Sequence, residues 1–141
     1  MSKIKSAKKF VYELIVKENH LDSFGHVNNA VYLQILEEAR WEFITQYGYG
    51  LEEIQKVGKG PVILEINLKF IKELKLRQNI KIETQCIEVQ SKVIHLVQKI
   101  INEKEELCTS ALFILGFFDL NKRKIINQSP EWFHAVGVEL E

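Results

Sequence analysis

The sequence predicts an α+β fold in which a five-stranded antiparallel sheet wraps around one long central helix. One segment has apolar residues at steps of three and four, three later segments are built on a period of two, and a fourth is almost continuously apolar. The connections between the later segments are only a few residues long, so neighbouring strands should be antiparallel. The chain has 141 residues, the length of one domain with its own core, and we expect residues 1–141 to form it.

The first strand is expected at residues 10–16. Its apolar residues alternate, but Val11 and Ile15 make the second face partly apolar as well. No other expected element of the same chain covers that second face. The lysines before the strand are expected to form a solvated, frayed terminus: Lys3, Lys5, Lys8 and Lys9.

The long helix is expected from Asn29 to Tyr47. Its apolar stripe is wide, so the helix should be buried rather than laid on a surface. Gly48 and Gly50 are typical of a helix end, and a short helical segment could follow at residues 51–57. The glycines and the proline after it should break the chain: Gly58, Gly60 and Pro61.

The remaining strands are expected at residues 64–70, 80–86, 94–100 and 107–118. Gln98 interrupts the apolar face of the third of these strands. The fourth is almost continuously apolar, which favours a place inside the sheet. Polar turns are expected at residues 102–105 and 121–124, and a short helix from Pro130 to Val138.

Composition excludes several classes of protein. Lys and Arg together number 19, as do Asp and Glu, so no net charge would attract nucleic acid or a membrane surface. We find no membrane-spanning apolar run and no signal-peptide pattern. Cys86 and Cys108 stand alone in apolar segments, which predicts reduced, buried thiols in a cytoplasmic protein. Two cysteines and four scattered histidines predict no metal site.

A polar segment directly before the long helix carries the strongest functional signal. It is Asp22-Ser23-Phe24-Gly25-His26-Val27-Asn28-Asn29. Glycine permits tight turns, asparagine caps helices, and a helix start presents unpaired N–H groups with a partial positive charge. A carboxylate aimed at a group held on that helix end would form a site that polarises and attacks a carbonyl.

The same motif, with Tyr32, Glu37, Ala39 and Arg40 in the helix, resembles the acyl-CoA thioesterases of the 4-hydroxybenzoyl-CoA thioesterase-like family. The resemblance runs from about residue 10 to about residue 125. It implies the hotdog fold and hydrolysis of acyl-CoA thioesters to free acid and coenzyme A. No cofactor is implied, because coenzyme A is part of the substrate.

The resemblance also assigns roles. Asp22 matches the catalytic aspartate, which attacks the thioester carbonyl directly or activates a water molecule. Asn29 matches the position whose backbone N–H binds the thioester oxygen, and a preorganised amide there would stabilise oxyanion charge. His26 and Asn28 match positions that shape the loop and, in some members, assist catalysis. The candidates for contact with the substrate are Gly25, Asn28, Tyr32 and Glu37.

Other interpretations remain open for these residues. Asp22 could simply cap a turn, His26 could be structural, and the two asparagines are good helix caps in any case. Glu37 is expected to pair with Arg40 three residues on, or else with a polar group of a second subunit. Two departures from relatives are visible: His20 replaces a second aspartate, and Phe24 stands where plant-type acyl-carrier-protein thioesterases have asparagine.

Two other functions compete with thioester hydrolysis. One is a hotdog dehydratase or hydratase, whose characteristic residues we do not find. The other is a non-catalytic acyl-CoA-binding module. The acyl group and its carrier, coenzyme A or acyl-carrier protein, stay open; we expect pocket depth to depend on how Tyr32 and Leu36 meet residues 51–60.

A homodimer or homotetramer is expected as the working unit. A five-stranded sheet leaves edge strands with unpaired backbone groups, and symmetric pairing of two edges satisfies them. The resemblance further implies a site between subunits, with Asp22 of one chain facing the helix start near Asn29 of its partner. The expected small-molecule partner is an acyl-CoA; nucleic acid and membrane are not expected partners.

Overall fold

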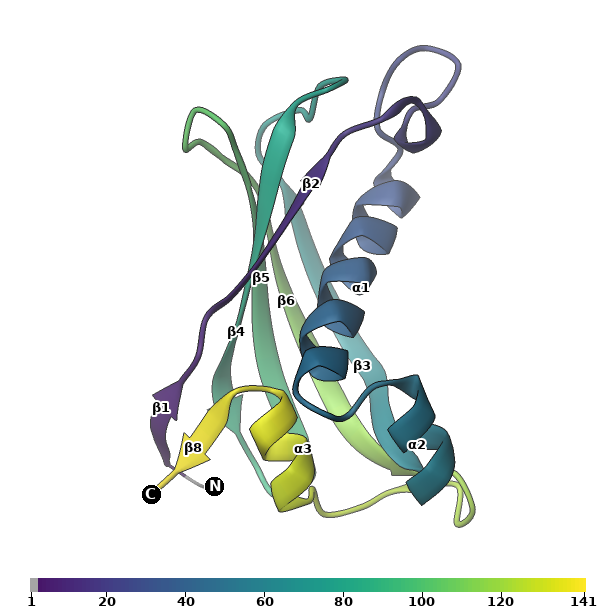
Figure 1. The fold of residues 1–141 in the computed structure, drawn as a ribbon, viewed down its shortest axis with the longest axis vertical. Coiled ribbons are helices and arrows are strands. Elements are labelled where there is room, and N and C mark those ends of the chain that lie inside the picture. The colour runs from purple at the N-terminus through teal and green to yellow at the C-terminus, as the bar shows by residue number, and fades with distance from the viewer. Residues whose placement is uncertain (1–2) are drawn as a thin grey trace.

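The computed structural model describes residues 3–141 and confirms the predicted α+β architecture (Figure 1). A curved antiparallel sheet has the strand order β2-β4-β5-β6-β3, with the short β7 beside β6. The long helix α1 lies across the concave face of this sheet. The strands are β1 (Ile4–Ala7), β2 (Phe10–Ile15), β3 (Lys59–Phe70), β4 (Asn79–Val89), β5 (Val93–Asn102), β6 (Leu107–Asp119), β7 (Lys124–Ile125) and β8 (Val138–Leu140). The helices are the 3-10 turn η1 (Glu18–His20), α1 (Asn29–Gln46), α2 (Leu51–Val57) and α3 (Pro130–Ala135).

The core lies between α1 and the sheet. Helix α1 buries a wide stripe that includes Leu36, Ala39 and Phe43, as the sequence predicts. Beneath it, alternate residues of β4, β5 and β6 are almost fully buried, among them Ile82 and Phe113. The helix ends one residue before Tyr47, whose backbone N–H still bonds back to the last turn.

Both chain ends differ from the prediction. Residues 4–7 are not a frayed terminus, because β1 pairs antiparallel with β8. Lys5 forms a 3.2 Å ion pair with Glu139 across that pair, and Lys8 donates to the hydroxyl of Tyr47. The terminal helix stops at Ala135, and Val138 begins β8 instead of closing the helix. Strands of four and three residues are too short to show a periodic pattern.

Strand β3 starts earlier than predicted. Gly60 and Pro61 do not break the chain but pair with Phe118 and Phe117 of β6. The proline is tolerated because β3 lies at the edge of the sheet, so its missing N–H breaks no second ladder. A bulge between Ile63 and Glu65 shifts the register within the strand.

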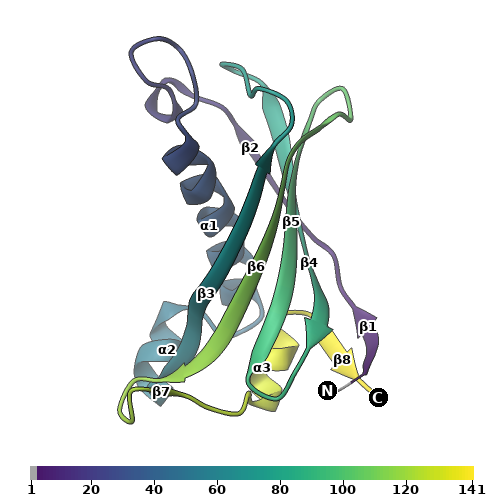
Figure 2. The ribbon, with the colours of Figure 1, turned by 180° about the vertical axis from the view of Figure 1, so that it is seen from behind.

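The convex face of the sheet is not covered by any helix among residues 3–141 (Figure 2). Val11 is 54% and Ile15 is 41% exposed on β2, as predicted from the second face of that strand. No helix in this range is long and apolar enough to cross a membrane.

Candidate functional site

The loop at residues 21–28 joins η1 to α1 and is folded into a tight hairpin. Leu21 and Val27 form an isolated antiparallel bridge, and the backbone N–H of Asp22 donates to the carbonyl of His26 at 2.9 Å. Gly25 turns the chain with φ +79°, a conformation that other residues rarely adopt. This geometry fixes where the Asp22 side chain can point.

The carboxylate of Asp22 is held by the backbone of its own loop. Its Oδ1 accepts hydrogen bonds from the N–H of Phe24 at 2.9 Å and of His26 at 3.1 Å. These two N–H groups, that of His26 foremost, hold the pKa of the Asp22 carboxyl below its usual value. Asp22 therefore caps the turn, as one interpretation proposed. It is also exposed and ionised, and its Oδ2 accepts no hydrogen bond from residues 3–141. A group with the properties of a nucleophile or base is therefore present.

The start of α1 presents a free amide. Asn28 is the N-cap, and its side chain accepts from the N–H of Ala30 at 2.8 Å. Asn29 is the first helical residue, and its own N–H has no acceptor within the described part of the chain. Such an amide, at the positive end of an 18-residue helix, can bind a carbonyl oxygen or an oxyanion.

An open depression of about 330 Å³ lies at the start of α1. Its lining comes from the loop, the first helical turns and the end of β3: Val27, Asn29, Tyr32, Phe70, Ile71, Lys72 and Glu73. His26 reaches the same rim, with Nε2 at 3.9 Å from Oε1 of Glu73. Asn29 and Glu73 therefore line one space, and the exposed imidazole of His26 lies beside Glu73 at its rim.

Tyr32 supports the depression from below. It is only 6% exposed, its ring meets the edge of Phe70 at 5.0 Å between centroids, and its hydroxyl accepts weakly from the N–H of Leu74 at 3.5 Å. Burial raises the pKa of the Tyr32 hydroxyl. The expectation that Tyr32 meets residues 51–60 is wrong, because β3 runs so that Phe70 lies beside the first turns of α1.

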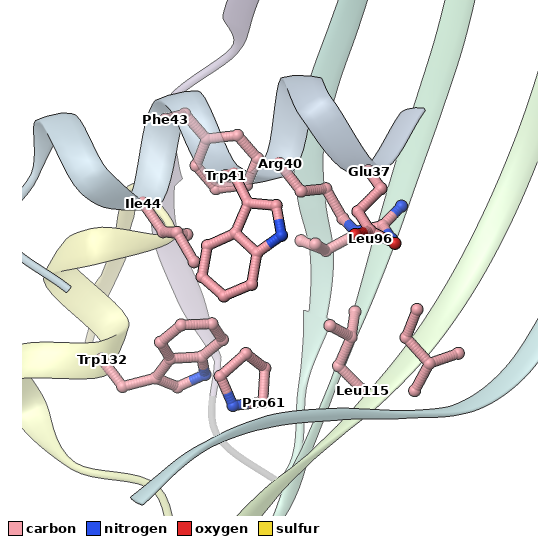
Figure 3. A pocket seen from close by; sticks show the side chains of 10 residues that line it. Glu37, Arg40, Trp41, Phe43, Ile44, Pro61, Leu96, Leu115 and Trp132 are labelled. Atoms are coloured by element: carbon pink, nitrogen blue, oxygen red, sulfur yellow. The ribbon is translucent and has the colours of Figure 1, made fainter. Parts of the chain in front are cut away.

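Glu37 lies further along α1, in the wall of a second, more enclosed cavity of about 180 Å³ (Figure 3). Eight of its ten lining residues are apolar: Trp41, Phe43, Ile44, Pro61, Ile63, Leu96, Leu115 and Trp132. The other two are Glu37 and Arg40. Glu37 is eight positions after Asn29 in the helix, about 12 Å along the axis, so the structure does not bring them into one contact site.

Arg40 does not form the local ion pair expected with Glu37. Its Nη1 instead donates to Oε1 of Gln98 at 2.8 Å, and its guanidinium lies 4.3 Å from the ring centre of Phe113. Burial lowers the pKa of Arg40 to about 10, while the nearby Glu37 charge opposes that change, so the group stays charged at neutral pH. The sequence indicated Gln98 only as an interruption in an apolar strand face.

Comparison with known proteins gives a family-level match. The model of the thioesterase-like superfamily matches residues 16–136. The long-chain acyl-CoA thioesterase FadM of Escherichia coli is 30% identical over 115 residues, which cover 81% of this chain and 86% of FadM. The chloroplastic acyl-acyl carrier protein thioesterase ATL3 of Arabidopsis thaliana is 38% identical over 63 residues, 45% of this chain. That match spans only 33% of the plant protein's length.

A solved structure shows the same fold. The hypothetical protein SAV2348 of Staphylococcus aureus, in complex with CoA, superposes with a TM-score of 0.85 and 17% identity. The superposition covers 96% of this chain and 85% of that chain.

Proposed function

This chain belongs to the thioesterase-like superfamily, and from that premise we propose that it hydrolyses acyl-CoA thioesters to a free acid and coenzyme A. The predicted family is thereby confirmed. The observation that carries the proposal is that one short segment contains both an ionised carboxylate held by the backbone, Asp22, and a backbone amide without an acceptor among the described residues, Asn29. FadM and ATL3 are both named as thioesterases, the first for acyl-CoA and the second for acyl-carrier protein.

The chemistry follows from these two groups. The Asn29 amide binds the thioester oxygen and stabilises the negative charge that develops on it. Asp22 either adds to the carbonyl carbon, giving an anhydride that water then cleaves, or takes a proton from a water molecule that adds instead. In both routes the C–S bond breaks, the thiolate of coenzyme A leaves and is protonated, and one water molecule is consumed.

A homodimer is the working unit in this proposal. Strand β3 has 12 residues at a free sheet edge, and it carries four exposed apolar residues: Ile63, Leu64, Ile66 and Phe70. Pairing of two β3 edges about a two-fold axis would satisfy their backbone groups. No hydrogen bond joins the Asp22 side chain to Asn29 within residues 3–141 of one chain. A site shared between subunits, with Asp22 facing the partner subunit's Asn29, is consistent with that.

A cytoplasmic location is part of the proposal. Cys86 and Cys108 are free and buried, and burial raises the pKa of the Cys86 thiol to about 12. Thiols of this kind are unreactive and suit a reducing compartment.

Replacement of Asp22 by Asn tests the proposal. The amide keeps the shape and can still accept the two loop hydrogen bonds, but it can neither attack nor take a proton, so kcat should fall about a hundredfold or more. Asn29→Ala is the matched control, because the proposed donor is backbone and survives the change. Near wild-type turnover of Asp22→Asn on a panel of acyl-CoA substrates would refute the assignment. Binding without turnover by the wild-type protein would favour a non-catalytic acyl-CoA-binding module.

A further inference from the structure

An apolar strip runs along the inner face of β3, beside α1. It consists of Pro61, Ile63, Ile66, Leu68 and Phe70. Ile63 and Ile66 pair with Leu115 and Phe113 of β6, which are buried, so the strip faces the helix side of the sheet. Yet Ile63 is 39%, Ile66 40% and Phe70 54% exposed. The helix therefore covers the neighbouring strands and leaves this strip open.

The strip joins the two cavities. Phe70 at one end lines the depression at the Asn29 amide. Pro61 and Ile63 at the other end line the 180 Å³ cavity, together with Trp132 and Ile44 (Figure 3). Strand β3 thus begins at this apolar cavity and ends at the proposed reaction centre, antiparallel to α1.

The dimensions of α1 set the length of this path. At about 1.5 Å per residue, Glu37 lies about 12 Å and Ile44 about 22 Å from Asn29 along the helix axis. An extended chain advances about 1.2 Å per bond, as three backbone bonds span about 3.5 Å in a polypeptide. A linear acyl chain of about 10 to 16 carbons would therefore reach from the Asn29 amide into the 180 Å³ cavity.

On the basis of the proposed function, we infer that the substrate carries an unbranched acyl chain of about 10 to 16 carbons, which lies along the β3 strip with its methyl end in the Trp132 cavity. The cavity is only slightly larger than the ~150 Å³ apolar cavity that holds a benzene molecule. It is too small for a helix of a partner subunit, whose diameter is about 10 Å. Of the two charged residues in the wall, Arg40 is engaged by Gln98 and Phe113, and Glu37 is exposed to solvent.

Two neighbouring residues of β3 provide a matched test. Ile63→Trp places a large ring in the cavity mouth. Leu64→Trp adds the same bulk on the opposite face, where Leu64 lies near Gly116 and Ile125. Both variants disturb the sheet edge, so an effect on the dimer alone would appear in both. The measurement is kcat/KM for acyl-CoA substrates from butanoyl to hexadecanoyl, with light scattering to report the oligomeric state.

The wild-type protein should prefer dodecanoyl- to butanoyl-CoA by tenfold or more, since each buried methylene raises affinity about fourfold. Ile63→Trp should lower that preference at least tenfold, and Leu64→Trp should change it less than twofold. If Ile63→Trp does not fold, Leu115→Phe fills the same cavity from β6 and should act in the same direction.

Failure of this inference is separable from failure of the proposed function. Hydrolysis of butanoyl-CoA or an aromatic acyl-CoA in preference to dodecanoyl-CoA would overturn the chain-length inference and leave the function standing. Absence of hydrolysis with every substrate would overturn the function. In that case, calorimetry with dodecanoyl-CoA against coenzyme A alone decides the inference: equal affinities overturn it, and tighter binding of dodecanoyl-CoA that Ile63→Trp weakens supports it.

Discussion

The side-chain oxygen of Gln98, in the middle strand of the sheet, accepts a 2.8 Å hydrogen bond from Nη1 of Arg40 on α1. The amide nitrogen of Gln98 donates to the carbonyl of Leu36 at 3.1 Å and to the hydroxyl of Thr84 at 2.9 Å. Gln98 has no exposed surface. One buried side chain therefore fixes the central helix against the sheet by two polar contacts, and a third joins β5 to β4.

Gln98→Leu should lower the free energy of unfolding by about 2 to 3 kcal/mol, because it removes a bond to a charged group and leaves buried polar atoms unpaired. Urea denaturation measures the change. The double variant Arg40→Met with Gln98→Leu should recover part of the loss, because it removes the unpaired charge as well. Unchanged stability of Gln98→Leu would mean that water replaces the lost contacts.

The Gln98 contacts show where sequence reasoning ends for this fold. The strands and the long helix are predictable because their apolar periods are local. The contact between Gln98 and Arg40 could not be predicted in this way, because Arg40 lies 58 residues away on another element. The Asp22 motif likewise allowed a turn cap, but it did not identify the two backbone donors, Phe24 and His26, that bond to Oδ1. Glu37 and Arg40 are near in sequence, which predicted an ion pair, whereas the packing of Arg40 over Phe113 turns it toward the sheet.

Asn28→Ala should lower the stability of the fold by about 1 kcal/mol, since it removes the cap that accepts from the N–H of Ala30. Activity should fall as well, because the same turn holds the Asn29 amide. Asn28→Ser keeps a capping oxygen and should restore both properties. Thermal unfolding and kcat on one acyl-CoA are the measurements. Restored stability without restored activity would show that the Asn28 amide itself contacts the substrate.

The pH dependence should reflect the backbone bonds of Asp22. The pKa of the Asp22 carboxyl lies below the ordinary 3.8 of an aspartate. The carboxylate is therefore ionised at neutral pH and becomes protonated only as the pH falls through the lowered pKa. The two hydrogen bonds to the Asp22 carboxylate also stabilise the folded loop at any pH above the pKa that Asp22 has in the unfolded chain. This stabilisation is lost as the pH falls through the lowered pKa of the folded protein. We therefore expect kcat to stay level from pH 8 down to about pH 5. An acid limb centred near pH 6.5 would contradict Asp22 as the limiting group and point to an imidazole.

The last prediction concerns the β3 edge. Leu64→Asp places a charge on the free edge strand, and in a two-fold β3 pair the two new carboxylates would lie close together. Like charges on paired strands repel, so the dissociation constant of the dimer should rise at least about tenfold. Ile87→Asp is the matched control, because Ile87 is 53% and Leu64 51% exposed, but Ile87 lies on the interior strand β4.

Light scattering across a dilution series, run beside the activity assay, measures both quantities. If the site lies between subunits, specific activity should fall with dilution in step with the dimer fraction, and at a higher concentration for Leu64→Asp than for the wild type. Ile87→Asp should follow the wild type. A protein that stays monomeric at micromolar concentration and hydrolyses acyl-CoA at full rate would refute the shared site. If Leu64→Asp and Ile87→Asp weaken the dimer equally, the dimer contact does not lie at the β3 edge. A contact at that edge would be weakened by Leu64→Asp alone.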